Sequence, residues 1–261
     1  MFIAFSAGKK TLVVGGYPYK EGRQTDIIDM EDPSFDCGKE NLFPIDIMNA
    51  VGGLIGQTPM VCGGITSGNP ALVKACYTFH ENGGWKEDQT ATLNYRRNGA
   101  EAGSVIIDNK LIVAGGSNYS SERAMQSSIE LVSPNTKATI LPMEIEDGIQ
   151  EGCVVRWDTN TFMIIGGNIW YGNKWERFGK DTFFVHMDNN TVTKGPQLID
   201  ERRNFACNEI IVNGEPFIVA AGGYTSKNDY TLVEMLSIPN YVDGWKKGQN
   251  FKSIIGKIGQ L

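Results

Sequence analysis

The arginines carry the clearest indication of binding chemistry in this chain. Only eight occur among 261 residues, and four of them form the adjacent pairs Arg96-Arg97 and Arg202-Arg203. An arginine presents a planar fork of N–H donors that binds a carboxylate or a phosphate through two hydrogen bonds. The net charge of the whole chain is −6. Two arginine pairs on an otherwise acidic chain therefore predict a surface that binds an acidic ligand, unless the pairs only brace neighbouring loops.

A second group of binding residues lies in segment 168–180, which we predict to be a long loop and which holds four aromatic residues and Arg177. Tryptophan, tyrosine and arginine dominate the energetically important positions of protein interfaces. Exposed loops on a rigid scaffold are also where recognition concentrates. We therefore predict that Trp170, Tyr171, Trp175 and Arg177 contact a partner. The alternative is that these aromatic side chains fold back as a cap on the domain.

Signals for catalysis are few. The two histidines, His80 and His186, are far apart in the sequence, and no metal-binding, nucleotide-binding or nucleophile motif occurs. We expect no catalytic residues, no metal and no cofactor. Three glutamates, Glu101, Glu151 and Glu209, lie on or beside predicted strands that would line the centre of the molecule. They would be hydrated structural groups or, together with nearby arginines, part of a site for a sugar acid.

Five glycine doublets indicate the elements that position these residues. Each doublet closes a short apolar run rich in valine and isoleucine, such as Phe162-Met163-Ile164-Ile165, which is typical of a buried strand. The doublets are Gly15-Gly16, Gly63-Gly64, Gly115-Gly116, Gly166-Gly167 and Gly222-Gly223, and their first glycines are 48, 52, 51 and 56 residues apart. A regular period of this length predicts a repeat architecture.

Each repeat unit contains four strand-length runs, of which the doublet run is the second. Polar turns such as Asp108-Asn109-Lys110 join the first run to the second, as in a hairpin. The fourth runs are Leu42–Ile47, Trp85–Leu93, Thr139–Ile145, Thr191–Ile199 and Trp245–Ile255. Pro44, Pro142 and Pro196 lie inside these fourth runs, which is tolerated only on an edge strand. The sequence thus predicts an all-β protein, a β-propeller of four-stranded antiparallel blades with the fourth strand outermost.

The chain resembles the kelch-repeat family over essentially all of its length. The family has a Gly-Gly after the second strand, an aromatic residue on the third and a tryptophan that opens the fourth. The best matches are Gly63-Gly64 with Phe79 and Trp85, and Gly222-Gly223 with Trp245. The other three units lack that tryptophan. Kelch units also often carry an arginine just before the innermost strand, where both arginine pairs stand.

The resemblance implies one domain, residues 1–261, with five kelch-type repeats. The approximate blades are 1–48, 49–97, 98–147, 148–203 and 204–261. Most kelch propellers close with six or seven blades, so the alternative is an incomplete six-bladed propeller.

The resemblance also implies a function, because kelch propellers often act as scaffold or substrate-receptor modules. In a propeller, the second-to-third-strand loops and the loops between blades lie on one face, and all arginines except Arg156 fall in such loops. We expect this face to bind a protein partner through an acidic segment. The alternative is a carbohydrate-active enzyme or sugar-acid binding protein that resembles the kelch-type mutarotases.

Composition narrows the partners and the compartment. The net negative charge argues against binding to nucleic acid or to an anionic membrane. The five cysteines are odd in number and form no CxxC motif, so we expect Cys62, Cys153 and Cys207 to be buried free thiols in a cytoplasmic protein. The alternative is a fragment of a secreted protein that lacks its signal peptide. Only then would the sequons Asn118-Tyr119-Ser120 and Asn189-Asn190-Thr191 matter. The sequence does not predict the oligomeric state.

Overall fold

The computed structural model describes residues 3–7, 10–16, 22–29, 31, 42–68, 71–80, 83–98, 105–118, 126–145, 148–171, 174–227 and 231–250. For residues 3–7, 170–171 and 174–177 it describes the backbone only. Apart from one short 3-10 helix, Tyr241–Asp243, the regular structure in these ranges consists of strands in antiparallel sheets, which confirms the predicted all-β class. None of the described residues forms a helix long and apolar enough to cross a membrane.

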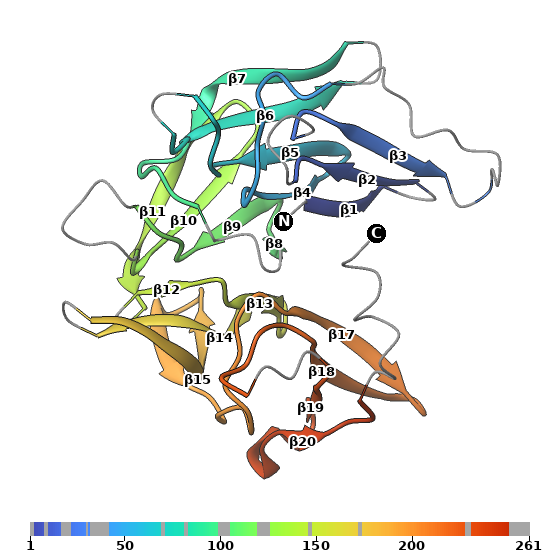
Figure 1. Ribbon diagram of the computed structural model, residues 1–261, viewed down its shortest axis with the longest axis vertical. Helices are drawn as coiled ribbons and strands as arrows, with labels where there is room; N and C mark the ends of the chain where they lie inside the picture. The colour runs from blue at the N-terminus through green and yellow to red at the C-terminus, as the bar shows by residue number, and fades with distance from the viewer. Residues whose placement is uncertain are drawn as a thin grey trace.

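The described strands form five sheets in chain order (Figure 1). The first contains β1 (Ile3–Ala7), β2 (Lys10–Val14) and β3 (Thr25–Asp29); the second contains β4 (Val51–Ile55), β5 (Thr58–Cys62), β6 (Ala75–His80) and β7 (Gly84–Thr92). The third contains β8 (Val105–Ile107), β9 (Lys110–Ala114), β10 (Ser128–Ser133) and β11 (Thr136–Glu144). The fourth contains β12 (Ile149–Gln150), β13 (Cys153–Arg156), β14 (Thr161–Tyr171), β15 (Lys174–His186) and β16 (Thr191–Lys194). The fifth contains β17 (Ala206–Val212), β18 (Glu215–Ala221), β19 (Val233–Ser237) and β20 (Lys246–Lys247).

The second, third and fifth sheets have the predicted order, in which each strand pairs with the next one along the chain. The first sheet differs, because residues 42–47 form no strand. Instead, the N–H groups of Phe43 and Ile47 donate to the carbonyls of Arg23 and Gly22, and both side chains are fully buried. The predicted strand Leu42–Ile47 is therefore wrong, since this segment satisfies its backbone against a loop and not against β3.

Successive sheets pack face to face around a curved path (Figure 1). The strand β1 contacts β4, β4 contacts β8 and β9, β8 contacts β13, and β13 contacts β17. Alternate side chains fill each interface, as the two-residue period of a strand requires. Between the fourth and fifth sheets, for example, Met163 and Phe184 lie in one apolar cluster with Ile218 and Leu236.

The glycine doublets connect one sheet to the next. All ten glycines have positive φ, which side chains strongly disfavour. The second glycine of a doublet donates its N–H to a carbonyl at the start of the next sheet or in the connection just ahead of it. These bonds run from Gly16 to Ile47 at 3.0 Å, from Gly64 to Arg97 at 2.8 Å, from Gly116 to Ile149 at 2.7 Å and from Gly167 to Arg202 at 2.8 Å. Within the described residues, no backbone bond of this kind starts from Gly223.

Substitution of Gly166 should test this role. Its φ is +55°, and a Cβ atom there would lie 3.0 Å from the carbonyl oxygen of Arg202. We expect Gly166→Val to lower the free energy of unfolding by about 1–3 kcal/mol, measured by urea denaturation. Gly68 is the control, because a Cβ there meets only ordinary contacts at 3.6 Å or more. Equal stability of Gly166→Val and Gly68→Val would show that the doublet is dispensable.

Four of the five cysteines form disulfides, contrary to the prediction of free thiols. Cys62 and Cys76, which lie directly opposite each other on β5 and β6, form a disulfide. Cys153 and Cys207 form a second disulfide, which joins β13 of the fourth sheet to β17 of the fifth. The prediction of free thiols at Cys62, Cys153 and Cys207 is therefore wrong. The reason is tertiary, because the partners meet only through strand register and sheet packing.

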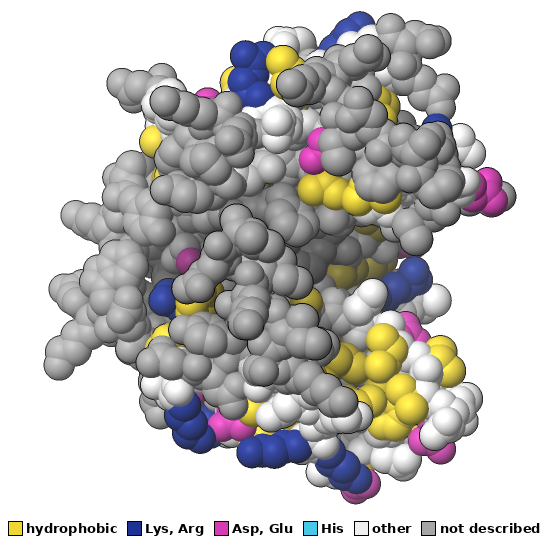
Figure 2. All heavy atoms as spheres, turned by 45° about the vertical axis from the view of Figure 1, so that its right-hand side comes forward, with side chains coloured by type: hydrophobic (Ala, Val, Ile, Leu, Met, Phe, Trp, Pro, Cys, Tyr) yellow, Lys and Arg dark blue, Asp and Glu magenta, His cyan; other side chains and the backbone are white. Residues whose placement is uncertain are grey.

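The outward face of the fifth sheet is less covered than the same face of the fourth. Val219 and Met163 both stand three residues before a glycine doublet, yet Met163 is fully buried and Val219 only partly. On β17, Ile210 and Val212 are 39% and 36% exposed. Figure 2 shows hydrophobic side chains at the surface of its lower half, where Figure 1 places this sheet. Among the described residues, no sheet packs on this face as the fifth packs on the fourth.

Candidate binding site

Two of the predicted binding arginines are internal. Arg97 and Arg202 are 1% and 0% exposed. Each forms a buried ion pair in which Nη2 lies 2.6 Å from a carboxylate oxygen, that of Glu130 for Arg97 and that of Glu234 for Arg202. The prediction that these two arginines contact a partner is therefore wrong, and the bracing role is the correct one. The two ion pairs are equivalent, because each glutamate lies on the third strand of its sheet.

The bracing works through backbone groups as well. The Arg97 guanidinium donates to the carbonyls of Gly115 and Ser128, and the Glu130 carboxylate accepts from the N–H of Asn94. Arg202 donates to the carbonyls of Ala220, Gly222 and Leu232, and Glu234 accepts from the N–H groups of Ile199 and Asp200. Burial lowers the pKa of the Arg97 guanidinium, and the Glu130 carboxylate opposes that shift. Each ion pair thus fixes a connection between sheets to the following sheet.

The other arginine of each pair is partly exposed. Arg96 donates to the carbonyl of Leu72 at 2.9 Å. The Arg203 side chain, 29% exposed, lies 3.3 Å from the Glu151 carboxylate. Its guanidinium also stands over the rings of Phe178 and Tyr224, at 5.1 and 5.9 Å from the ring centres. Arg203 is therefore presented at the surface between two aromatic rings.

Segment 168–180 is not a loop. β14 continues through Gly166-Gly167 to Tyr171 and β15 begins at Lys174, so the backbone forms a hairpin that pairs Asn168 with Phe178. Four predicted binding residues lie on this hairpin, and their side chains lie outside what the structure describes: Trp170, Tyr171, Trp175 and Arg177. The prediction of a loop is wrong because both strands extend past the glycine doublet.

The hairpin and Arg203 lie at the same end of the fourth sheet. The strand β12 (Ile149–Gln150) pairs with the hairpin at Asn168 and Ile169, and Glu151, the partner of Arg203, follows it directly. Arg156 stands at the opposite end, where β13 turns into β14 and its Nε donates to the carbonyl of Asp158. Arg156 is exposed and therefore provides a matched control for charge changes at the hairpin end.

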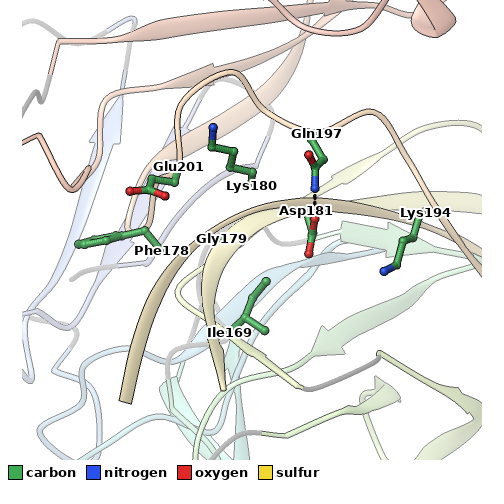
Figure 3. A pocket seen from close by; sticks show the side chains of 8 residues that line it. All are labelled: Ile169, Phe178, Gly179, Lys180, Asp181, Lys194, Gln197 and Glu201. Carbon is green, nitrogen blue, oxygen red and sulfur yellow. Dashed lines mark hydrogen bonds between the residues drawn. The ribbon is translucent and has the colours of Figure 1, made fainter. Parts of the chain in front are cut away.

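A polar cavity of about 420 Å³ lies at the base of the hairpin (Figure 3). Within it, the amide of Gln197 donates to Asp181 at 2.6 Å, and Lys180 donates to the carbonyl of Ile199 at 2.9 Å. The cavity is lined by Ile169, Phe178, Gly179, Lys180, Asp181, Lys194, Gln197 and Glu201. A smaller cavity of about 130 Å³ shares Lys180 and Glu201 with it and extends to Asp200, Thr225, Ser226 and Lys227. We refer to the two together as the hairpin groove.

Charged groups of both signs meet in the hairpin groove. Lys227 donates to the Asp200 carboxylate at 2.9 Å, and Lys247 lies 3.6 Å from it. The hydrogen bond from Lys227 holds the pKa of Asp200 below its usual value, with Lys247 adding to the effect. No hydrogen bond to Glu201 occurs among the described residues. The groove therefore offers ammonium groups to a ligand carboxylate and one carboxylate to a ligand donor.

The described residues show no arrangement typical of acid–base or metal catalysis. The rings of His80 and His186 bond to Thr78 and to Thr193 respectively, and no described cluster of His, Cys, Asp and Glu could hold a metal ion. Of the carboxylates singled out from the sequence, Glu151 pairs with Arg203, Glu209 is exposed on β17, and Glu101 lies outside the described residues.

Sequence reasoning missed the lysines and acids of the hairpin groove. It assigned binding to arginines and aromatic residues, which left the charged residues between 180 and 201 unconsidered. The available signal was their position, because they flank the third strand and the connection to the next sheet. Comparison of the sequence with models of protein families gives no match, and comparison with curated proteins gives no relative.

Proposed function

We propose that this chain is a binding module built on a five-bladed β-propeller of the kelch-repeat type. The support is the forward series of hydrogen bonds from the glycine doublets, which links each of the first four sheets to the next. The family resemblance rests on the same doublets and on Trp85 and Trp245, both of which are buried. The incomplete six-bladed alternative is favoured by one observation, the uncovered outward face of the fifth sheet.

The partner that we propose is a protein segment rich in carboxylates, bound in the hairpin groove. One observation carries this proposal, namely that cations gather there on a chain whose net charge is −6. The groove and its border hold five cations, Arg203, Lys180, Lys194, Lys227 and Lys247, against four carboxylates, Glu151, Asp181, Asp200 and Glu201. Three of these carboxylates already accept hydrogen bonds, Glu151 from Asn168 and Arg203, Asp181 from Gln197, and Asp200 from Lys227. Lys180 and Lys194 would attract ligand carboxylates, and Glu201 would accept a hydrogen bond from the ligand.

Reversal of charge at Lys180 and Lys194 should test this proposal. The probe is a fluorescently labelled peptide rich in glutamate, followed by anisotropy at increasing salt concentration. We expect Lys180→Glu with Lys194→Glu to weaken binding by about tenfold or more, since a loss of 1.4 kcal/mol corresponds to a factor of ten. The salt dependence should also become shallower because fewer charges pair.

Two controls make the test specific. Arg156→Glu, at the opposite end of the sheet, should leave binding unchanged. A peptide with glutamine in place of glutamate should not bind the unaltered protein. If Arg156→Glu weakens binding as much as the double change, the hairpin groove is not the site.

A second candidate function is the binding of a sugar acid. The size of the larger cavity favours it, because 420 Å³ lies within the usual range of small-molecule sites. Phe178 also lies beside polar side chains, as a stacking surface for a sugar ring would. Calorimetric titration with a hexuronic acid separates the two functions. Saturable binding that the double change abolishes, together with no binding of the acidic peptide, would establish the sugar acid as the ligand.

A further inference from the structure

The turn between β15 and β16 has the form of an acceptor for an N-linked glycan. It carries the sequence Asn189-Asn190-Thr191, the acceptor motif of this modification. All three residues are exposed. Asn190 has φ +56°, which turns the chain so that the Thr191 hydroxyl donates to Oδ1 of Asn189 at 2.6 Å. No described residue accepts a hydrogen bond from Nδ2 of Asn189, the nitrogen that would be modified.

The disulfides supply an independent indication of the compartment. Cys62–Cys76 and Cys153–Cys207 use four of the five cysteines of the chain. Such bonds form and persist in oxidising compartments, whereas the cytosol keeps thiols reduced. N-linked glycans are added in the secretory pathway, which is oxidising. The disulfides and the exposed motif therefore point to the same route of maturation.

We propose that Asn189 is an N-glycosylation site and that the protein matures in an oxidising, glycosylating compartment. This proposal replaces the expectation of a cytoplasmic protein. It does not depend on the proposed binding function.

The chemistry of the modification is a glycosyl transfer without a redox step. A bond forms between Nδ2 of Asn189 and C1 of the first sugar of a lipid-pyrophosphate-linked oligosaccharide. The bond between that C1 and the phosphate oxygen breaks, and the lipid pyrophosphate leaves with the bonding electrons. The amide nitrogen gives up one proton to a base of the transferase.

The position of Asn189 is compatible with ligand binding. The turn lies beside the β13–β14 turn, because the N–H of Met187 donates to the carbonyl of Asn160 at 2.8 Å. That end of the fourth sheet is the one that carries Arg156, opposite the hairpin. A glycan on Asn189 would therefore extend away from the hairpin groove.

The second sequon of the chain differs from the first. Asn118 is only partly exposed and already makes an interaction within the structure. The other two residues of that motif, Tyr119 and Ser120, lie outside the described residues. We therefore expect Asn189 to be the more fully occupied site.

The test is production of the full chain behind a secretion leader in a eukaryotic host, with intact masses measured before and after treatment with peptide N-glycosidase. We expect the unaltered protein to lose the mass of a glycan on treatment. Asn189→Gln and Thr191→Ala should lack that glycan. Asn190→Gly is the matched control, because it changes the same turn, keeps the motif and retains a residue suited to positive φ. It should remain glycosylated.

Peptide mapping without reduction completes the test. It should recover Cys153 linked to Cys207 and Cys62 linked to Cys76. A protein that is secreted without a glycan on Asn189, or one whose glycan resides only on Asn118, would overturn the glycosylation site. Free thiols at Cys153 and Cys207 in the secreted protein would overturn the oxidising compartment. Binding of an acidic peptide in the hairpin groove would be unaffected by either result.

Discussion

Arg202→Met should lower the free energy of unfolding by about 3–5 kcal/mol, the usual cost of removing one partner from a buried ion pair. Glu234 is 1% exposed, so its carboxylate would lose its cation in a place that water does not reach. Three backbone carbonyls, those of Ala220, Gly222 and Leu232, would lose their donor at the same time. Urea denaturation followed by tryptophan fluorescence would measure the change.

Arg203→Met is the matched control, because it alters the adjacent arginine in the same connection. Its pair with Glu151 is partly exposed, and such pairs contribute about 0–1 kcal/mol. The bracing role of Arg202 would be contradicted if the two substitutions destabilised the protein equally.

Removal of the disulfide between β13 and β17 should have an effect of similar size. Cys153 and Cys207 are separated by 54 residues, and closing a loop of that length in the unfolded chain corresponds to about 4 kcal/mol of stabilisation. We expect Cys153→Ala with Cys207→Ala to lose about 2–5 kcal/mol, measured by urea denaturation without reductant.

The second disulfide provides the comparison. Cys62 and Cys76 are 14 residues apart, so Cys62→Ala with Cys76→Ala should lose less, about 3 kcal/mol by the same loop argument. If neither pair of substitutions nor added reductant changes the stability of the protein, the two disulfides do not form.

Much of the strand pattern was predictable from the sequence. The apolar runs that end in Gly-Gly are long enough and regular enough to predict both the strands and their order within a sheet. The prediction of a strand at Leu42–Ile47 is wrong. Phe43 and Ile47 are apolar enough to suggest a strand, but their backbone N–H groups bond to a loop 20 or more residues away in the sequence. The prediction of a loop at residues 168–180 is wrong for a different reason. In the other units the strand ends at the glycine doublet, whereas β14 continues through Gly166-Gly167.

The candidate site was less predictable, because burial decides the role of an arginine and the sequence alone does not report it. A signal was nevertheless present. Glu130 and Glu234 stand inside the apolar runs Ile129-Glu130-Leu131-Val132 and Val233-Glu234-Met235-Leu236. A buried acid requires a partner, and the arginines lie 33 and 32 residues earlier. The recurrence of this spacing in two units identifies the pairs.

The forward hydrogen bonds of the glycine doublets have a consequence for how the molecule comes apart. They couple each sheet only to the sheets beside it, as in a row of nearest neighbours. An interior sheet leaves this row only when two interfaces break. The first and fifth sheets, at the two ends of the row, are each held by a single interface among the described residues, and local opening favours the elements with the fewest contacts. The Cys153–Cys207 bond crosses the interface of the fifth sheet, so this sheet remains covalently attached to the fourth sheet when it opens, and the interface can form again between strands that are already held close together.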